Sequence, residues 1–374
     1  MNEKELREIR RRFRPERNNI TKIKGCLVNG EGAIVSKITQ SMITGESSVA
    51  ERLLGVMKKA IGGKLGTNLT EVEYSTKQVG ESLAHGLLMR LRESALEDND
   101  ALDAFYDRVR GSLKLEGGYA ILLASDIYDV PGYSKDGAVS ESSETFSYIV
   151  CAICPTKELP EAITFRGSDS SFHLLNVSGA LASCEVGFMF PAFDDRKTNI
   201  YGALLYRRSL TESYPELCEA VLDCEGGLSP TAQRQTFSDC LAGSLGDELT
   251  LEVVSSLYKQ VEELEERAKE EKSPEILTVS RDTVKTMLEC AGVSEDKLEA
   301  LSDELAESFG ANTLLTPKNI VKTNRFEISA PEVSIKISPE HRDLVTTQTI
   351  DNVKYLMIRV DGGVEVNGIN IKFD

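Results

Sequence analysis

Three charged residues near the middle of the chain have the order found in metal-dependent nucleases. Glu185 is followed by Asp195 and, two residues later, by Lys197. In such enzymes two carboxylates hold a divalent ion that activates water, and the lysine stabilises the negative charge that develops. A pattern of three residues needs a matching strand context before it identifies a site. A metal-dependent nuclease or other phosphoesterase at Asp194 and Asp195 is therefore one alternative.

Other catalytic motifs are missing from the sequence. The histidines His85, His173 and His341 have no metal-binding spacing, and there is no Gly-x-Ser-x-Gly elbow, nucleotide fingerprint or kinase motif. The segment 62–67 has the residue types of a phosphate loop without its spacing, and we interpret it as a helix end and turn. We expect no cofactor and no bound metal, and we favour a protein that is not an enzyme.

The chain has eight cysteines and one CxxC motif, at Cys151 and Cys154. The motif lies inside an apolar run predicted to be a strand, where a three-residue offset places the two thiols on opposite faces. This argues against a redox pair and against half of a zinc site. Because no secretory signal is present, we expect all eight cysteines to be reduced and to act as small core residues.

Asp195 and Lys197 fall within a stretch, 187–206, that is rich in aromatic residues, although aromatic residues make up only 6% of the chain. Its middle, 194–199, is polar, and its end, 200–206, reads as a buried strand. One interpretation is an aromatic platform beside a charged binding turn. The candidate binding residues are then Phe190, Phe193, Asp194, Asp195, Arg196, Asn199 and Tyr201. The other interpretation is a strand–turn–strand corner whose aspartates stabilise the turn.

The N-terminus is basic and the remainder of the chain is acidic. Residues 1–24 hold nine Lys/Arg against four Glu, a net +5, which leaves −22 for the rest of a chain of net charge −17. Asn2 and Glu5 form a predicted capping box, and Leu6, Ile9 and Phe13 form the apolar stripe of a helix that ends before Pro15. The candidate phosphate contacts are Arg7, Arg10, Arg11, Arg14, Arg17, Lys22 and Lys24. Alternatively, the arginines pair with carboxylates of the acidic part.

Local patterns around these residues predict an α+β protein. The predicted strands are 20–28, 33–39, 70–75, 118–127, 145–154 and 200–206, with helices at 48–61, 79–94 and 98–112. We expect 156–186 to be irregular. Further helices are predicted at 212–223, 230–243, 247–271, 280–291 and 294–308, and strands at 332–337 and 353–360. The Asn367-Gly368 turn predicts a final hairpin packed on 353–360, with Val366 opposite Ile369 and Val364 opposite Ile371.

The 374 residues accommodate more than one domain. We predict a mixed or antiparallel sheet domain with packed helices over 1–210, a helical segment over 211–325 and a small β unit over 326–374, with a linker near 272–275. The longest apolar run, 148–154, is too short to cross a bilayer. A cytoplasmic protein without a membrane segment is expected.

Three segments resemble a bacterial family known as domain of unknown function 4317. They are 3–15 (EKELREIRRRFRP), 187–196 with 199–203 (GFMFPAFDDR and NIYGA), and 363–368 (GVEVNG). The resemblance extends nearly from end to end and implies no particular chemistry.

In its order of elements the chain also resembles the bacterial nucleoid-associated protein family. The shared features are the opening hairpin, the paired strands near 120 and 150, a helix after Ser229-Pro230 and the strand 333–337 (VSIKI). This second resemblance implies binding to nucleoid DNA or nucleoid proteins, as a homodimer and without catalysis. A protein-binding adaptor that uses the aromatic platform is a further alternative.

Overall fold

The computed structural model describes residues 1–133, 139–310, 314–323, 326–360, 362–366 and 368–371. The chain forms two compact units. Unit 1 comprises Met1–Ser229 together with Pro274–Ile276, and unit 2 comprises Pro230–Ser273 with Leu277–Asp374. The short Pro274–Ile276 segment belongs to unit 1 because the backbone N–H of Glu3 donates to the Pro274 carbonyl at 3.0 Å. Helices and strands mix throughout, as the predicted α+β class requires.

Unit 1 is built on an antiparallel sheet of strand order β2-β1-β4-β5-β7-β10-β3, with β6 paired to the far part of β5. The strands are β1 (Lys22–Val28), β2 (Ile34–Ser41), β3 (Leu69–Glu73), β4 (Tyr119–Tyr133), β5 (Val139–Arg166), β6 (Ser171–Leu181), β7 (Val186–Phe190) and β10 (Gly202–Arg207). The predicted opening hairpin is confirmed, since β1 pairs with β2 around the turn at 29–33. All five residues of β7 are buried, so the aromatic stretch begins inside the sheet.

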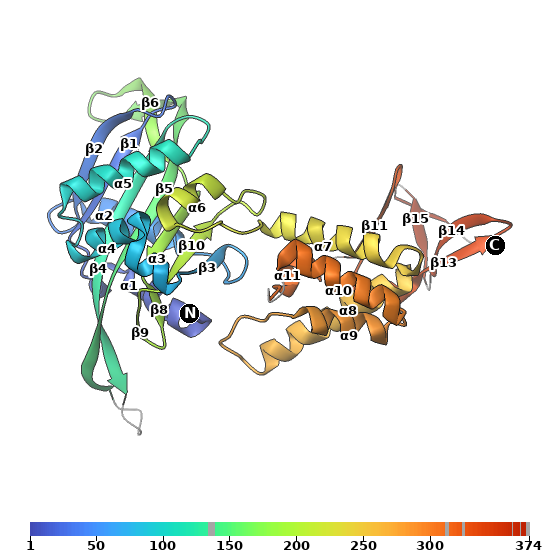
Figure 1. Cartoon of the computed structure of the whole chain (residues 1–374). Coiled ribbons are helices and arrows are strands. Elements are labelled where there is room, and N and C mark those ends of the chain that lie inside the picture. Colours follow the sequence, from blue (N-terminus) through green and yellow to red (C-terminus); the bar gives the residue numbers. More distant parts are fainter. Residues whose placement is uncertain (134–138, 311–313, 324–325, 361, 367, 372–374) are drawn as a thin grey trace. The chain divides into compact units, whose positions relative to one another are not determined.

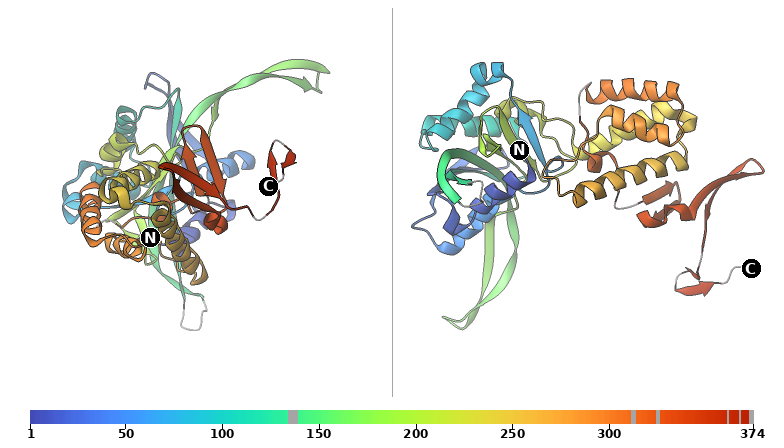
Figure 2. Two further views of the ribbon diagram at one scale, coloured as in Figure 1. Left: turned by 90° about the vertical axis from the view of Figure 1, so that its right-hand side faces the viewer. Right: turned by 90° about the horizontal axis from the view of Figure 1, so that it is seen from below.

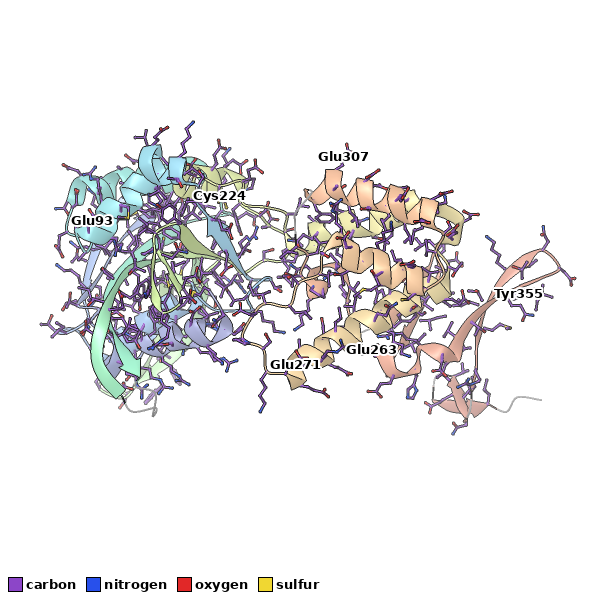
Figure 3. The ribbon with its side chains drawn as sticks, turned by 60° about the horizontal axis from the view of Figure 1, so that its bottom comes forward. Glu93, Cys224, Glu263, Glu271, Glu307 and Tyr355 are labelled. Atoms are coloured by element: carbon purple, nitrogen blue, oxygen red, sulfur yellow. The ribbon has the colours of Figure 1, made fainter. Side chains whose placement is uncertain are left out.

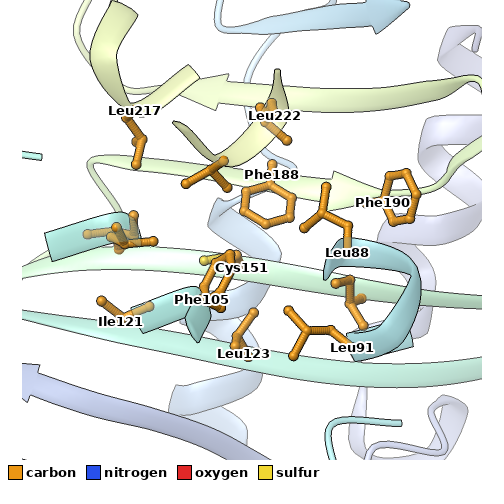
Figure 4. Packing of buried hydrophobic residues seen from close by; sticks show 14 of the residues in the cluster. Leu88, Leu91, Phe105, Ile121, Leu123, Cys151, Phe188, Phe190, Leu217 and Leu222 are labelled. Carbon is orange, nitrogen blue, oxygen red and sulfur yellow. The ribbon is translucent and has the colours of Figure 1, made fainter. Parts of the chain in front are cut away.

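Helices cover both faces of this sheet, which gives unit 1 two apolar cores. They are α1 (Glu3–Arg12), α2 (Ser47–Lys59), α3 (Thr76–Glu81), α4 (Leu83–Glu93), α5 (Asn99–Ser112) and α6 (Pro215–Leu222). Helices α4, α5 and α6 pack on one face, where Phe105, Cys151 and Phe188 meet (Figure 4). Helices α1 and α2 pack on the other face, around Cys154. Cys151 and Cys154 are fully buried in different cores, so the predicted opposite orientation of the two thiols is confirmed.

The expectation of irregular structure over 156–186 is wrong. Strand β5 continues to Arg166 and turns back as β6, forming a long ribbon that projects from the sheet of unit 1 (Figure 2). Ile163 pairs with Leu174, and Phe165 pairs with Phe172. These residues alternate with polar ones, which is the period-two signal of a strand. The glycines and serines around them obscured that signal.

The helices of unit 2 enclose an apolar core, to which Leu245, Leu288 and Leu301 contribute. Its helices are α7 (Pro230–Leu245), α8 (Leu251–Glu270), α9 (Arg281–Cys290), α10 (Glu295–Phe309) and the short α11 (Pro317–Ile320). The four longer helices agree closely with the prediction. Over the described ranges, no helix combines the length and apolar character needed to cross a bilayer.

The C-terminal part of unit 2 consists of two-stranded sheets. Its strands are β11 (Phe326–Ala330), β12 (Val333–Ile337), β13 (Val345–Ile350), β14 (Val353–Ile358), β15 (Val364–Val366) and β16 (Ile369–Ile371). Val366 lies opposite Ile369 and Val364 opposite Ile371, so the predicted register is confirmed. Asn367 itself lies outside the described residues. In the described residues this hairpin and β14 belong to separate two-stranded sheets, so no strand pairing joins them. Side-chain packing of the hairpin on β14 stays a prediction.

Candidate functional site

Helix α1, which carries three of the seven predicted phosphate contacts, packs firmly against the sheet. Its predicted capping box is confirmed: Asn2 Oδ1 accepts from the N–H groups of Lys4 and Glu5, at 3.0 and 3.1 Å, and the Asn2 N–H donates to Glu5 Oε2 at 2.8 Å. Leu6 and Ile9 are fully buried in the core shared with α2. The helix therefore presents its remaining faces in fixed positions.

Arg10 of this helix points inward. Its Nε donates to the Ile61 carbonyl at 2.7 Å, and its Nη2 donates to the Gly63 carbonyl at 2.7 Å. Both carbonyls belong to the turn that follows α2, where a helix end leaves acceptors unsatisfied. The interpretation of 62–67 as a helix end and turn is confirmed. Arg10, a predicted phosphate contact, stabilises that turn, so its substitution is no clean test of ligand binding.

Arg12 is also engaged internally. Its guanidinium makes two bonds of 3.0 Å to the carboxylate of Asp126, which is only 1% exposed, and stacks on the Tyr128 ring at 4.8 Å. Asp126 accepts two further bonds, from the Asn19 N–H at 2.7 Å and from the Tyr148 hydroxyl at 2.9 Å. Burial and the negative charge of Asp126 raise the pKa of Tyr148 well above its usual value. The pairing alternative thus holds for Arg12.

The four other arginines of the N-terminal segment are exposed, and we call them the exposed arginine set: Arg7, Arg11, Arg14 and Arg17. Among the residues that the structure describes, none of the four guanidinium groups has a carboxylate at ion-pair distance. Lys22, by contrast, pairs with Glu97 at 2.5 Å, and Lys24 is half-buried. The seven predicted phosphate contacts therefore reduce to these four arginines.

The central stretch is a corner between strands, as the second interpretation predicted. Strands β8 (Ala192–Asp194) and β9 (Lys197–Asn199) form a small hairpin, and both turn residues, Asp195 and Arg196, have positive φ angles of 47° and 58°. Two such residues in succession make the turn that suits a two-residue hairpin. Phe190 and Phe193 are fully buried. The predicted aromatic platform is therefore wrong, because these rings are core residues.

The polar side chains of this corner bind other parts of unit 1. Arg196 donates to both carboxylate oxygens of Glu8, at 2.8 and 3.2 Å, and so fixes the turn to α1. Asp194 accepts from Asn199 at 2.9 Å and contacts the amino group of Met1 at 2.5 Å. Of the seven central candidates, only Asp195 and Tyr201 are exposed.

A cavity of about 220 Å³ lies beside this corner, between β3, β8 and β10. Glu71, Glu73, Asp194 and Tyr201 are among its lining residues. Partial burial opposes ionisation of Asp194, but hydrogen bonds from the Met1 amino group and Asn199 outweigh it and lower the pKa of this carboxyl. The cavity is polar and acidic, and two of its carboxylates already contact an amino group.

The structure does not bring the three nuclease-like residues together. Glu185 precedes β7 and binds Arg208 and the Tyr214 hydroxyl, whereas Asp195 and Lys197 follow that strand. At roughly 3.3 Å per residue, the five residues of β7 separate the two carboxylates by more than 10 Å. No group of three or more His, Cys, Asp or Glu side chains within the described segments is arranged to hold a metal ion.

Two features of unit 1 were missed by reasoning from the sequence. One is the apolar face of the β5–β6 ribbon, whose alternation was readable at Ile163, Phe165 and Phe172. The other is a thiol pair, Cys218 and Cys224, beside a buried arginine. The spacing of Cys218 and Cys224 matches no known motif, and the burial of Arg207 beside them depends on the tertiary fold.

A family model described as "Domain of unknown function (DUF4317)" matches residues 1–369. A search of curated proteins gives no match.

Proposed function

Since the chain belongs to this family of unassigned activity, we propose its function from the site: a non-enzymatic binding protein that contacts nucleic-acid phosphates through the exposed arginine set. The observation that carries the proposal is the division of the N-terminal arginines. Arg10 and Arg12 have internal partners, whereas the four others are exposed to solvent, on α1 or in the segment directly after it. The nucleoid DNA to which the resemblance points is one such ligand.

Charge explains why a local set matters in this protein. A chain of net charge −17 repels nucleic acid as a whole. Arg7 and Arg11 lie one helical turn apart, and Arg14 and Arg17 follow in the segment after α1. Guanidinium groups bind phosphates in a two-pronged geometry, and each contact releases counterions. A short row of uncompensated arginines is therefore where a polyanion can meet the protein.

We predict a steep salt dependence of binding to a labelled DNA duplex of mixed sequence, measured by fluorescence anisotropy. Four phosphate contacts give a slope of log K against log salt of roughly −3 to −4. Arg7→Gln with Arg11→Gln should weaken binding to every sequence and make the slope shallower by about 2. These two side chains have no structural partner among the described residues, so thermal unfolding should be unchanged.

The matched control is Arg267→Gln with Lys269→Gln, which removes the same charge from exposed positions at the end of α8. Equal binding by the two double variants would contradict the proposal. The same duplex, incubated with Mg²⁺ or Mn²⁺, tests the nuclease alternative: cleavage that is lost in Asp195→Ala would replace the binding function with a catalytic one.

A second candidate function, self-association through the β5–β6 ribbon, is favoured by its exposed apolar face. Ile163, Phe165, Phe172 and Leu174 are 73, 58, 74 and 63% exposed. They form two cross-strand pairs, and the two phenylalanine rings lie 5.5 Å apart. Side chains of this size in solvent mark an interaction surface when they are contiguous.

The edge of β6 favours a second copy of the chain as the partner. This 11-residue strand pairs only with β5 in the described part of the sheet, and its sequence has no Lys, Arg, Asp, Glu or Pro. Natural edge strands usually carry such residues to prevent pairing with another chain. Antiparallel pairing of β6 with its own copy would extend the sheet and make the two apolar faces continuous.

We therefore predict a dimer in solution, measured by light scattering after size-exclusion chromatography. Phe165→Ser with Phe172→Ser should give a monomer, because it removes the central pair of the apolar face. The control, Thr164→Ser with His173→Gln, changes the opposite face of the ribbon and should leave a dimer. A wild-type chain that is monomeric at high micromolar concentration would eliminate this candidate.

A further inference from the structure

Two cysteines, Cys218 and Cys224, lie close together at the C-terminal end of α6. Cys218 is fully buried within the helix. Cys224, which is labelled in Figure 3, follows the helix and is half-buried. The left-handed Asp223, with φ 50°, turns the chain back so that the Cys224 N–H donates to the Cys218 carbonyl at 3.3 Å. The Cys224 Sγ also lies 3.9 Å from the same carbonyl, so the second cysteine packs directly on the first.

A buried cation lies beside this pair. Arg207 of β10 is 2% exposed, and its Nη1 and Nη2 donate to the Gly226 carbonyl and the Thr70 hydroxyl, both at 2.9 Å. Its Nε has no hydrogen-bond partner, and no carboxylate pairs with it in the described part of the chain. A buried charge normally has a counterion. The groups beside Arg207 that can become anions are the two cysteines.

The surroundings distinguish the two sulfurs. The hydrogen bond from Cys218, aided by the Gly226 N–H and by Arg207, outweighs burial and lowers the pKa of Cys224. The same hydrogen bond and burial raise the pKa of Cys218. Gly226 permits this close approach: its φ is +73°, and a Cβ there would lie 3.0 Å from Cys218 Sγ. These surroundings favour the thiolate form of Cys224 over that of Cys218.

We propose that Cys218 and Cys224 form a reversible, peroxide-responsive disulfide, with Arg207 as the counterion of the Cys224 thiolate. The thiolate attacks one oxygen of the peroxide, the O–O bond breaks, and with one proton the products are Cys224 sulfenic acid and water. The Cys218 thiol then attacks the sulfenic sulfur, forms the S–S bond and releases a second water. One peroxide is reduced and two thiols are oxidised, and an added thiol reductant restores both.

The test treats the full-length native chain with limiting hydrogen peroxide at neutral pH, alkylates the remaining thiols and maps the cysteines by mass spectrometry. The expected result is a Cys218–Cys224 linkage with a mass loss of two hydrogens. Cys290, which is exposed and far from Arg207 in sequence, is the internal control and should remain a thiol. Oxidation of Cys290 before the pair, or a pair that stays reduced, would overturn the proposal.

Two variants separate the roles of the residues. In Cys218→Ser the resolving thiol is lost, so a sulfenic acid should persist on Cys224 and be trapped by dimedone. In Arg207→Met, if the chain folds, the pH midpoint of Cys224 alkylation should rise by about one unit, a tenfold slower reaction near neutrality. An unchanged midpoint would remove Arg207 from the mechanism. If Arg207→Met does not fold, the Cys218→Ser variant decides by itself: absence of trapped sulfenic acid on Cys224 would overturn the proposal.

Discussion

Asp126→Asn is expected to lower the free energy of unfolding of unit 1 by about 3–5 kcal/mol, because it leaves a largely buried guanidinium without its counterion. The carboxylate of Asp126 is 1% exposed and accepts hydrogen bonds from Arg12, Asn19 and Tyr148. An asparagine keeps the shape but replaces one acceptor oxygen with a donor. That donor would face the Arg12 guanidinium, which can only donate.

The measurement is urea unfolding followed by far-UV circular dichroism, with amide exchange of β4 and β5 peptides to assign the transition to unit 1. The control is Asp103→Asn, which breaks a 2.7 Å pair with Lys37 whose side chains are 47 and 61% exposed. Exposed pairs contribute only about 0–1 kcal/mol. The double variant Arg12→Met with Asp126→Asn should recover part of the loss. Equal effects of Asp126→Asn and Asp103→Asn would show that the network does not stabilise the fold.

Local features of the sequence were sufficient to predict several elements of this fold. The Asn2–Glu5 capping box, the apolar stripe of α1 and the register around residue 367 all depend on residues within a few positions of one another. The opposite orientation of Cys151 and Cys154 follows from strand geometry alone. These signals are short-range, so they do not require knowledge of the tertiary fold.

The roles of the charged and aromatic candidates depend instead on distant partners. Arg10 and Arg11 are neighbours of the same type, yet Arg10 reaches carbonyls about fifty residues away and Arg11 faces solvent. The partner of Arg12 is 114 positions along the chain. Periodicity can assign a residue to one face of α1, but only the strand order decides what that face meets.

The same reasoning explains the misplaced aromatic platform. Phe190 and Phe193 belong to consecutive short strands, with Pro191 between them. A cluster of aromatic residues next to a charged turn fits both a binding surface and a core that ends at a turn. Burial settles the question: β7 lies between β5 and β10, with helices on both faces of the sheet.

Phe193→Ala should therefore destabilise unit 1 by about 3–5 kcal/mol, the usual cost of removing a fully buried phenylalanine and leaving a cavity. The Phe193 ring lies 4.7 Å from the Phe146 ring and 6.2 Å from the Tyr128 ring, centroid to centroid. Tyr128 also stacks under Arg12, so a cavity here would loosen the support of α1. The effect should appear in the same urea transition as that of Asp126→Asn.

Tyr201→Ala is the matched control, since this aromatic residue of the same stretch is 45% exposed. Substitutions at such surface positions usually change stability by about 0.5 kcal/mol or less. If the stretch acted as a binding platform, Phe193→Ala would reduce ligand binding and leave unfolding unchanged. A core residue gives the reverse: DNA binding per folded molecule stays constant, while the fraction folded at a given urea concentration falls. Measuring DNA binding and urea unfolding on both variants therefore distinguishes a residue that binds ligand from a residue that stabilises the core.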